Sequence, residues 1–507
     1  MPVTMANTSP HGDRDLVDGR AGLPTPISTT SYWHRQPSAK LIGHRTSNEL
    51  PLSTDVIVIG SGITGAFAAQ ELVNAGRSVV MLEAREACWG ATGRNGGHCQ
   101  PGVWDSPSDI ARFELETFHH LQDFILKHDI PCDWRVVGGI HAIYSPDVLE
   151  AAKAQIKRLK QYPDLRDKAI LIQDQDELVA KRVPGALAAV YQPLAAQLWP
   201  YKLVAWLLER LLSEHDVTTF NLQTNTPVTR IEQCEEDGSL SWLVHTERGQ
   251  AKAHDVLLAI NAYTSYLVPN MTSLITPVRG QVCALEPPPG AIQLLHSYCW
   301  MKDADHQYLI QRDPKDLQAN NTDRERASKS QVEDKFIIFG GGRPAALKDD
   351  EGTSDDSKIN IAVTQALQRY LHEALDLYPD IDDLQNPETS PPLRAAYEWT
   401  GIMGYSSDGC PWIGRVPDTL LSNEHTVWGQ SMNRASSGAL WMCGGYTGHG
   451  MPVAARCGVA VAQMILGRLD GVQVPRQWMA TDERVQAARS AELPQTLHEI
   501  LQGLPVA

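Results

Sequence analysis

An apolar run that ends in three closely spaced glycines constrains this chain more than any other feature. Residues 55–59 (DVIVI) lead into Gly60, Gly62 and Gly65, which have the spacing G-x-G-x-x-G. In this spacing the first glycine permits a tight turn, the second lets backbone N–H groups approach a pyrophosphate, and the third lets a helix pack closely on the strand. We therefore predict a strand and a helix over residues 63–75 whose N-terminus faces phosphate groups.

A second apolar run, residues 78–82, ends at Glu83, 18 residues beyond Gly65. A carboxylate at this place can accept hydrogen bonds from ribose hydroxyls and would repel a 2′-phosphate. Glycines in this spacing also occur in ordinary turns, so the order of strand, glycines, helix, strand and acid carries the inference. That order favours an adenine dinucleotide and disfavours NADP.

A second glycine-dense loop, residues 88–98 (CWGATGRNGGH), follows directly after the acid. An NAD-binding fold would normally continue into a helix here. A loop with so few Cβ atoms suits a backbone that lies against a large flat ligand, such as an isoalloxazine ring. This loop favours FAD as the dinucleotide, and a flexible surface loop is the alternative.

Further motifs follow in a specific order along the chain. They are 226–231 (TPVTRI), 256–264 (VLLAINAYT), 276–281 (TPVRGQ), 399–401 (WTG), 408–414 (DGCPWIG) and 444–452 (GGYTGHGMP). Together with the N-terminal glycines, they resemble the FAD-dependent oxidoreductases of the D-amino-acid-oxidase-like superfamily, especially the glycine oxidase, sarcosine oxidase and gamma-glutamylputrescine oxidase branch. The resemblance implies an α/β fold, with a Rossmann-type FAD-binding domain and an inserted α+β substrate domain built on a mixed or antiparallel sheet.

The length of 507 residues exceeds a usual single-core domain, so two domains are expected. Residues 306–312 and 335–343 look like paired strands, and the polar stretches 313–334 and 348–358 are predicted surface insertions, with a lid or docking surface as the alternative. The expected division is 1–50 as a partly disordered extension, 51–135 with 200–280 and 395–470 as the FAD-binding domain, 136–199 with 281–394 as the substrate domain, and 471–507 as a C-terminal tail.

By resemblance, Val228 would contact adenine through its backbone, and Asn261 would lie near the cofactor at a strand end. The glycine-rich turn 444–451 would point a helix N-terminus at the pyrimidine edge of the flavin, where negative charge collects on reduction. Plain packing or a helix cap is the alternative for each. The expected cofactor-binding residues are Gly60, Gly62, Ile63, Thr64, Gly65, Glu83, Ala84, Arg85, Ala91, Thr92, Arg94, Asn95, Gly96, Gly97, His98, Val228, Asn261, Gly445, Tyr446, Gly448, His449, Gly450 and Met451.

The resemblance implies oxidation of a small-molecule amine or amino acid. An amine with a free lone pair can pass a hydride from its α-carbon to flavin N5, which leaves an imine for water to hydrolyse, and O2 would reoxidise the flavin to give H2O2. Such a site needs positioning more than acid–base residues. The candidates are His98, Tyr405 and His449 as catalytic residues, and Arg279, Trp300, Arg343 and Trp399 as the substrate pocket. For the aromatic residues, which include Trp104, the alternative is ordinary core packing. For the arginines, it is a structural ion pair.

Two departures from the sarcosine oxidase pattern concern the substrate and the electron acceptor, and a third concerns attachment of the flavin. Pro452 stands where a lysine binds the substrate carboxylate, so Arg279, Arg343 or Arg394 would have to supply that charge. Ile338 falls near the position of the lysine linked to oxygen activation. A dehydrogenase, a pathway enzyme acting on a larger metabolite and a non-catalytic flavin-binding protein therefore stay open as alternatives.

Covalent attachment of the flavin is not expected, because Gly401 occupies the place of the attaching cysteine. His98, Cys99 and Cys410 lie near the motifs but not at the matching position, and the two cysteines are better explained as buried small hydrophobes. The expected cofactor is thus noncovalent FAD.

Composition excludes several classes of partner. A formal charge of −16 and a pI near 5.5 argue against nucleic acid or an anionic membrane surface, and no segment approaches the length of a membrane span. Nine cysteines without a C-x-x-C pair argue against zinc and against a disulfide framework. We expect no metal site, a reducing compartment and, by default, the cytoplasm; the sequence gives no oligomeric state.

Overall fold

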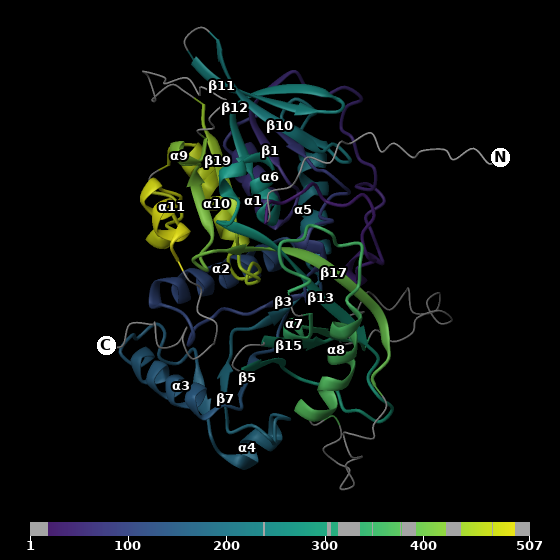
Figure 1. Cartoon of the computed structure of the whole chain (residues 1–507), viewed down its shortest axis with the longest axis vertical. Coiled ribbons are helices and arrows are strands. Elements are labelled where there is room, and N and C mark those ends of the chain that lie inside the picture. Colours follow the sequence, from purple (N-terminus) through teal and green to yellow (C-terminus); the bar gives the residue numbers. More distant parts are fainter. Residues whose placement is uncertain are drawn as a thin grey trace, which may run out of the picture.

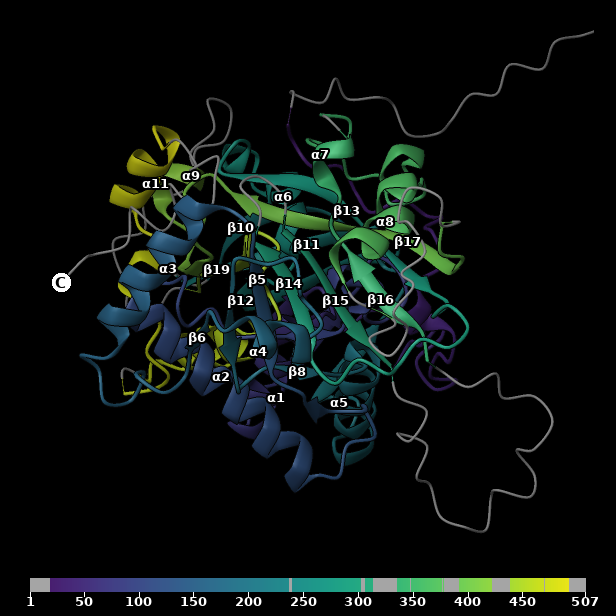
Figure 2. The ribbon, with the colours of Figure 1, turned by 90° about the horizontal axis from the view of Figure 1, so that it is seen from below.

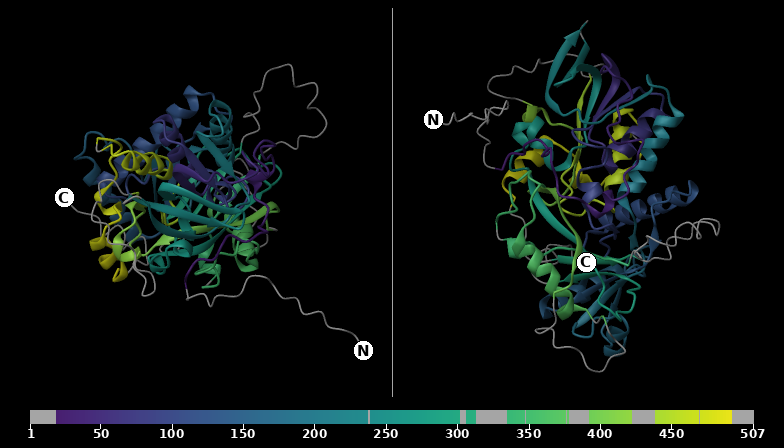
Figure 3. Two further views of the ribbon diagram at one scale, coloured as in Figure 1. Left: turned by 90° about the horizontal axis from the view of Figure 1, so that it is seen from above. Right: turned by 90° about the vertical axis from the view of Figure 1, so that its right-hand side faces the viewer.

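The computed structural model describes residues 19–236, 239–301, 306–312, 335–346, 348–375, 377, 392–421, 438–468 and 470–491. Two large sheets follow one another along the long axis of the molecule, each with its own helices (Figure 1). A side view shows the same two parts (Figure 3). The expected surface insertion at 313–334 lies outside the described residues.

The first sheet has a parallel core. Its order is β19 (Leu440–Gly444), β12 (Gly249–Leu258), β1 (Ser53–Ile59), β2 (Val79–Leu82) and β9 (Phe220–Gln223). Antiparallel strands extend it: β11 (Ser239–Thr246) pairs with the first half of β12, β10 (Val228–Glu236) pairs with β11, and β18 (Trp412–Arg415) pairs with β19.

The continuous apolar run of β1 is explained by burial on both faces. Val56 and Val58 belong to a hydrophobic core with α1 (Ile63–Asn74) and α10 (Ala454–Ile465). Ile57 and Ile59 belong to a second core on the opposite face. Strands covered on both faces need no polar alternation, so a run such as DVIVI is what a central parallel strand requires.

The second sheet is mixed, and only its β14–β5 pair is parallel. Its order is β17 (Ala395–Ser406), β13 (Ile275–Leu285), β16 (Ile337–Gly340), β15 (His306–Gln311), β14 (Ser297–Met301), β5 (Gly139–Ile143), β7 (Ala188–Gln192) and β6 (Ile170–Ile172). Seen from below, α8 (Ile361–Ala374) lies near β13 and α3 (Pro146–Leu159) near β6, at opposite sides of the sheet (Figure 2).

The remaining elements connect or flank the two sheets. A small sheet of β3 (His98–Cys99), β8 (Ala196–Gln197) and β4 (Arg135–Val136) and the long helix α2 (Ser108–Lys127) join the two parts (Figure 1). The other helices are α4 (Gln175–Ala180), α5 (Pro200–Glu214), α6 (Thr264–Leu267), α7 (Arg343–Ala346), α9 (Asp418–Leu421) and α11 (Asp482–Arg489), with 3-10 turns η1 (Tyr32–His34), η2 (Ala91–Arg94), η3 (Asn261–Tyr263), η4 (Pro269–Met271) and η7 (Arg476–Trp478).

The predicted fold class is confirmed, with a parallel sheet next to a mixed one. The expected strand pair at 306–312 and 335–343 is the antiparallel pair β15–β16. The whole of β13 and β17 belongs to the second sheet, although the expected domain boundaries fall at 280 and 395; the division into domains stays a prediction. Within the described ranges, none of the helices combines the length and apolar character needed to cross a bilayer.

Candidate functional site

A cavity of about 490 Å³ is lined by residues of both large sheets. Residues at the carboxyl ends of β1, β2 and β12 border it, among them Gly60, Glu83 and Ala259. From the second sheet, Tyr308 of β15 and Tyr405 of β17 border it. Open parallel sheets bind ligands outside the carboxyl ends of their strands, so this is where the fold predicts a cofactor.

The first glycine turn opens the N-terminus of α1 toward this cavity. Gly60 has a φ of +101°, and a Cβ there would lie 2.6 Å from the carbonyl oxygen of Ala259, so only glycine fits. Gly62 is the N-cap of α1 and makes no side-chain cap hydrogen bond. Gly65 packs against Gly60 and does not border the cavity. The N–H of Ile63 donates to Oγ1 of Thr92 (3.1 Å), and the N–H groups that follow it at the start of the helix are a ready anion site.

Glu83 is held at the end of β2. Its Oε2 accepts hydrogen bonds from the backbone N–H (3.0 Å) and hydroxyl (2.6 Å) of Ser61, and its Oε1 accepts one from the N–H of Arg85 (2.9 Å). These bonds fix the carboxylate beside the glycine turn, where it borders the cavity. The position suits ribose hydroxyls, which can donate to the remaining lone pairs.

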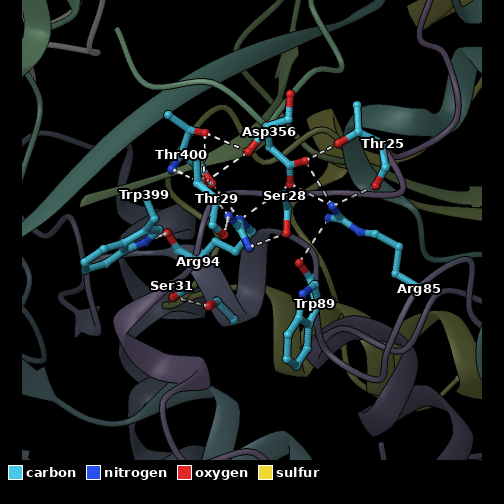
Figure 4. A network of polar contacts seen from close by, with 12 residues as sticks. Thr25, Ser28, Thr29, Ser31, Arg85, Trp89, Arg94, Asp356, Trp399 and Thr400 are labelled. Carbon is cyan, nitrogen blue, oxygen red and sulfur yellow. Dashed lines mark hydrogen bonds and ion pairs between the residues drawn. The ribbon is translucent and has the colours of Figure 1, made fainter. Parts of the chain in front are cut away.

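The second glycine loop is fixed by a buried ionic network (Figure 4). Asp356, fully buried, pairs with Arg85 at 2.9 Å and with Arg94 at 3.5 Å. Arg94 also donates to the carbonyl oxygen of Thr400 (2.5 Å), and Trp399 donates to the carbonyl oxygen of Arg94 (2.7 Å). Burial, opposed by the Asp356 charge, lowers the pKa of Arg94 to about 10. The loop is therefore anchored rather than a flexible surface loop.

The N-terminal segment completes this network. Thr25 donates to Asp356 (2.6 Å), and both the carbonyl oxygen and the hydroxyl of Thr29 accept hydrogen bonds from Arg94. Tyr32 and Trp33, which follow these threonines, are fully buried. The acidic stretch 348–358 is not simply a surface insertion, because Asp356 and Asp350 are buried ion-pair partners.

The third glycine-rich turn leads into α10. Asn261, itself at a φ of +47°, accepts hydrogen bonds at its Oδ1 from the N–H groups of Gly445 (2.9 Å) and Tyr446 (3.4 Å). The N-cap residue of α10, Val453, makes no side-chain cap hydrogen bond. The Tyr446 hydroxyl lies 2.7 Å from Oγ1 of Thr64 on α1. The starts of the two helices are thus held together at one cavity.

Two histidines at the cavity have opposite electrostatics. Burial lowers the pKa of His98 to about 4, and its Nε2 lies 3.1 Å from the Ser297 hydroxyl, so the ring is neutral near pH 7. For His449, burial is outweighed by the Glu114 carboxylate, which lies 2.8 Å from its Nε2, and the pKa is raised. The His449 side chain is 51% exposed and borders the cavity.

Arg343 and Tyr405 form a pair at the second sheet. The guanidinium donates to the Tyr405 hydroxyl (2.7 Å), lies over its ring, and is 3.7 Å from Glu351. Burial raises the pKa of Tyr405 against the opposing Arg343 charge, so the phenol keeps its proton. Tyr308 is confined nearby, because a Cβ at Gly96 or Gly340 would collide with its ring.

The structure brings most of the expected residues to one cavity but leaves some outside. Trp300 and Trp399 are fully buried in the core, Arg279 is paired with Asp350 at 2.6 Å, and Arg394 is exposed beside Glu286. The expected residues bordering the cavity are Gly60, Gly62, Ile63, Thr64, Glu83, Ala84, Arg85, Ala91, Thr92, Arg94, Asn95, Gly96, His98, Val228, Asn261, Arg343, Tyr405, Tyr446, Gly448, His449, Gly450 and Met451; those not bordering it are Gly65, Gly97, Gly445, Arg279, Trp300 and Trp399.

Other cavity residues were not expected from the sequence. Two of them, Gln100 and Asp105, lie within ten residues after the second glycine loop. Polar residues so close to a cofactor loop could have been predicted to border the cavity. His141 is a polar residue inside the apolar strand β5 and carries the same kind of signal. The unexpected residues include Leu23, Pro24, Gln100, Asp105, His141, Gln281, Cys299, Met301, Gln307, Tyr308 and Met403.

Comparisons with known proteins agree with this geometry. The family described as FAD dependent oxidoreductase (DAO) matches residues 55–464. "Probable oxidoreductase OrdL" of Haemophilus influenzae is 24% identical over 83% of this chain and 86% of the relative. Gamma-glutamylputrescine oxidoreductase of Escherichia coli is 22% identical over 86% and 89%. The crystal structure of glycine oxidase from Geobacillus kaustophilus superposes with a TM-score of 0.61 at 16% identity, covering 85% of this chain and 99% of that one.

Proposed function

This chain belongs to the DAO family of FAD-dependent oxidoreductases, and we propose that it oxidises a C–N bond of an amine or amino-acid derivative to an imine. The observation that carries the proposal is the single cavity shared by three glycine-rich turns and by the Arg343–Tyr405 pair. Similarity to gamma-glutamylputrescine oxidoreductase and to glycine oxidase supports an amine or amino-acid substrate.

The residues present fit FAD. Gly60, Gly62 and the start of α1 form a cradle for the pyrophosphate, with Glu83 placed for a ribose and Val228 for the adenine. Residues 90–98 and the start of α10 would hold the ring system. Bound FAD supplies a two-electron acceptor, to which the substrate carbon passes a hydride.

We propose that the FAD is noncovalent. Cys99 is fully buried, and burial raises the pKa of its thiol, so it offers no thiolate. Burial also raises the pKa of Cys410 to about 11, and this residue does not border the cavity. Gly401, at the expected attachment position, carries no side chain that could bond to a flavin.

The polar residues of the cavity have separate roles in this proposal. Arg343, with Tyr405 oriented against it, is placed to bind a substrate carboxylate. His98, neutral near pH 7, positions the substrate without competing for its proton. Glu114 raises the pKa of His449 against the effect of burial and so favours its protonated form, which would place positive charge near the start of α10 and stabilise an anionic ring edge.

The proposed electron acceptor is O2, reduced to H2O2. A dehydrogenase is the second candidate, because Ile338, near the expected position of the oxygen-activating lysine, is a fully buried core residue. The proposed location is the cytoplasm, since all nine cysteines are free thiols. The acidic net charge of −16 supports the expectation that neither nucleic acid nor an anionic membrane is a partner.

The test is anaerobic addition of a panel of primary and secondary amines and amino acids to the FAD-loaded protein. Bleaching of the oxidised-flavin absorption band by at least one amine is expected, and a peroxide assay after air is readmitted separates oxidase from dehydrogenase. Arg343→Met should weaken substrates that carry a carboxylate and spare those without one. FAD binding without bleaching by any member of the panel would contradict the proposal and favour a non-catalytic flavin protein.

A further inference from the structure

One carboxyl oxygen at the cavity lacks a hydrogen-bond partner in the described structure. Asp105 borders the cavity, and its Oδ1 is shut off from solvent without a hydrogen-bond partner in the described structure. Buried carboxylate oxygens are normally hydrogen-bonded, because leaving one unpaired costs free energy. Asp105 itself borders the cavity, so a turn of its carboxyl group would present this oxygen to a donor that arrives with a ligand.

The charges around Asp105 leave an excess of negative charge. Glu114 is buried, and its Oε2 accepts hydrogen bonds from the Gly102 N–H (2.6 Å) and from His449 (2.8 Å). Even with His449 protonated, the two carboxylates leave one net negative charge. Burial, opposed by His449 and reinforced by Glu114, raises the pKa of Asp105 to about 6.

The cationic arginines that border the cavity are engaged elsewhere. Arg85 and Arg94 pair with the buried Asp356. Arg343 donates to Tyr405 and lies 3.7 Å from Glu351. None of these arginines pairs with Asp105. An ammonium group that enters the cavity would therefore form a favourable ion pair with this carboxylate.

Apart from His449, which already pairs with Glu114, the side chains described next to Asp105 here are neutral. His141 accepts a hydrogen bond at its Nδ1 from the buried indole of Trp104 (2.9 Å), which fixes the orientation of its ring. Burial, reinforced by the charge of Asp105, raises the pKa of Cys299 to about 12, so this residue stays a neutral thiol. The cavity wall here combines the Asp105 carboxyl group with neutral groups and with His449, which is paired with Glu114.

We propose that Asp105 binds a second, non-reacting cationic nitrogen of the substrate, so that the enzyme takes amines bearing two basic nitrogens. The inference rests on the proposed function. A nitrogen whose carbon loses a hydride must first lose its proton, and an ion pair with a carboxylate holds that proton in place. The nitrogen that Asp105 holds is therefore not the one that is oxidised.

The experiment compares two probes of equal chain length, 1,4-diaminobutane and butylamine, titrated anaerobically into the FAD-loaded protein. Binding is followed by perturbation of the flavin spectrum and turnover by its bleaching. The wild-type protein should bind the diamine more tightly by about tenfold or more, the size expected for a charge-assisted hydrogen bond. Asp105→Asn, which keeps the shape, should bring the ratio close to one.

Two further variants separate charge from folding. Asp105→Ala should also lose the preference, and FAD content shows whether each variant is folded. Glu116→Gln is the matched control on α2, because Glu116 is 59% exposed and pairs with Arg456; it should keep the preference of the wild type. An unchanged ratio in folded Asp105→Asn, or equal binding of both probes by the wild type, would overturn the inference.

The two proposals fail in different ways. If the diamine perturbs the spectrum selectively but no amine bleaches the flavin, amine oxidation fails and cation binding by Asp105 stands. If amines bleach the flavin with no preference for the diamine, amine oxidation stands and the role of Asp105 fails.

Discussion

Asp356 shows how a single residue outside the cavity can position the second glycine loop. It pairs with both Arg85 and Arg94, which border the cavity, and it comes from a stretch that looks like an acidic surface insertion in the sequence. Composition alone cannot distinguish a buried charge from an exposed one, because the partners lie more than 250 residues away along the chain. This role was therefore beyond prediction.

Asp356→Asn should destabilise the protein by about 3 kcal/mol or more, since it leaves two buried guanidinium groups without their partner. Denaturant unfolding measures this loss, and FAD content measures the loosening of the loop. Glu150→Gln is the control, because Glu150 is 72% exposed and its pair with Lys153 should contribute little. A change below about 0.5 kcal/mol for Asp356→Asn would mean that the buried network is not needed.

The pH dependence of stability tests Asp105 without any ligand. Its folded-state pKa, about 6, lies above the usual 3.8, so the folded protein holds this proton more tightly than the unfolded chain. Protonated Asp105 therefore stabilises the folded protein fully below about pH 4, and this stabilisation is lost as the pH rises through about 6. Asp105→Asn should therefore gain about 2 kcal/mol over the wild type between pH 4 and pH 7. Urea unfolding at both pH values checks this, and a constant difference would refute the unusual pKa.

At the scale of elements, the sequence predicted the glycine turns and their helices, because those positions need residues without a Cβ. For the second sheet it predicted the strand pair at 306–312 and 335–343 but could not tell which side chains of a strand face the cavity. On β14, Cys299 borders the cavity while its neighbour Trp300 packs in the core with Phe339. Successive side chains of a strand point to opposite faces, and an aromatic residue fits a core as well as a pocket. Only the position of the sheet decides which face meets the ligand.

The crossing of α1 and α10 depends on glycine at the contact. A Cβ at Gly458 of α10 would collide with the carbonyl oxygen of Thr64 on α1. Gly458→Ala should cost about 1–3 kcal/mol by overpacking and should weaken FAD retention, because both helices start at the cavity. Gly185→Ala is the matched control, since nothing lies within 4 Å of that position. Thermal unfolding and FAD content check both variants, and equal behaviour would show that the helices can move apart.

At the scale of the whole molecule, the cavity takes residues from both sheets, so its ligand should stabilise both. FAD at about 100 times its dissociation constant should add about 2.7 kcal/mol to the free energy of unfolding. Hydrogen exchange should slow in β1 of the first sheet and in β17 of the second. NADP should have no such effect, because Glu83 would repel its 2′-phosphate. Slowing confined to the first sheet would contradict a shared site.

The buried Tyr32 and Trp33 and the threonines before them have a practical consequence for anyone who produces this protein. The family match covers residues 55–464, so boundaries taken from it would discard the segment that braces the second glycine loop. They would also discard Arg484, which donates to Asp408 at 2.8 Å. A recombinant fragment trimmed to residues 55–464 should emerge colourless and prone to aggregate, whereas one that starts before residue 19 should keep its yellow colour through purification.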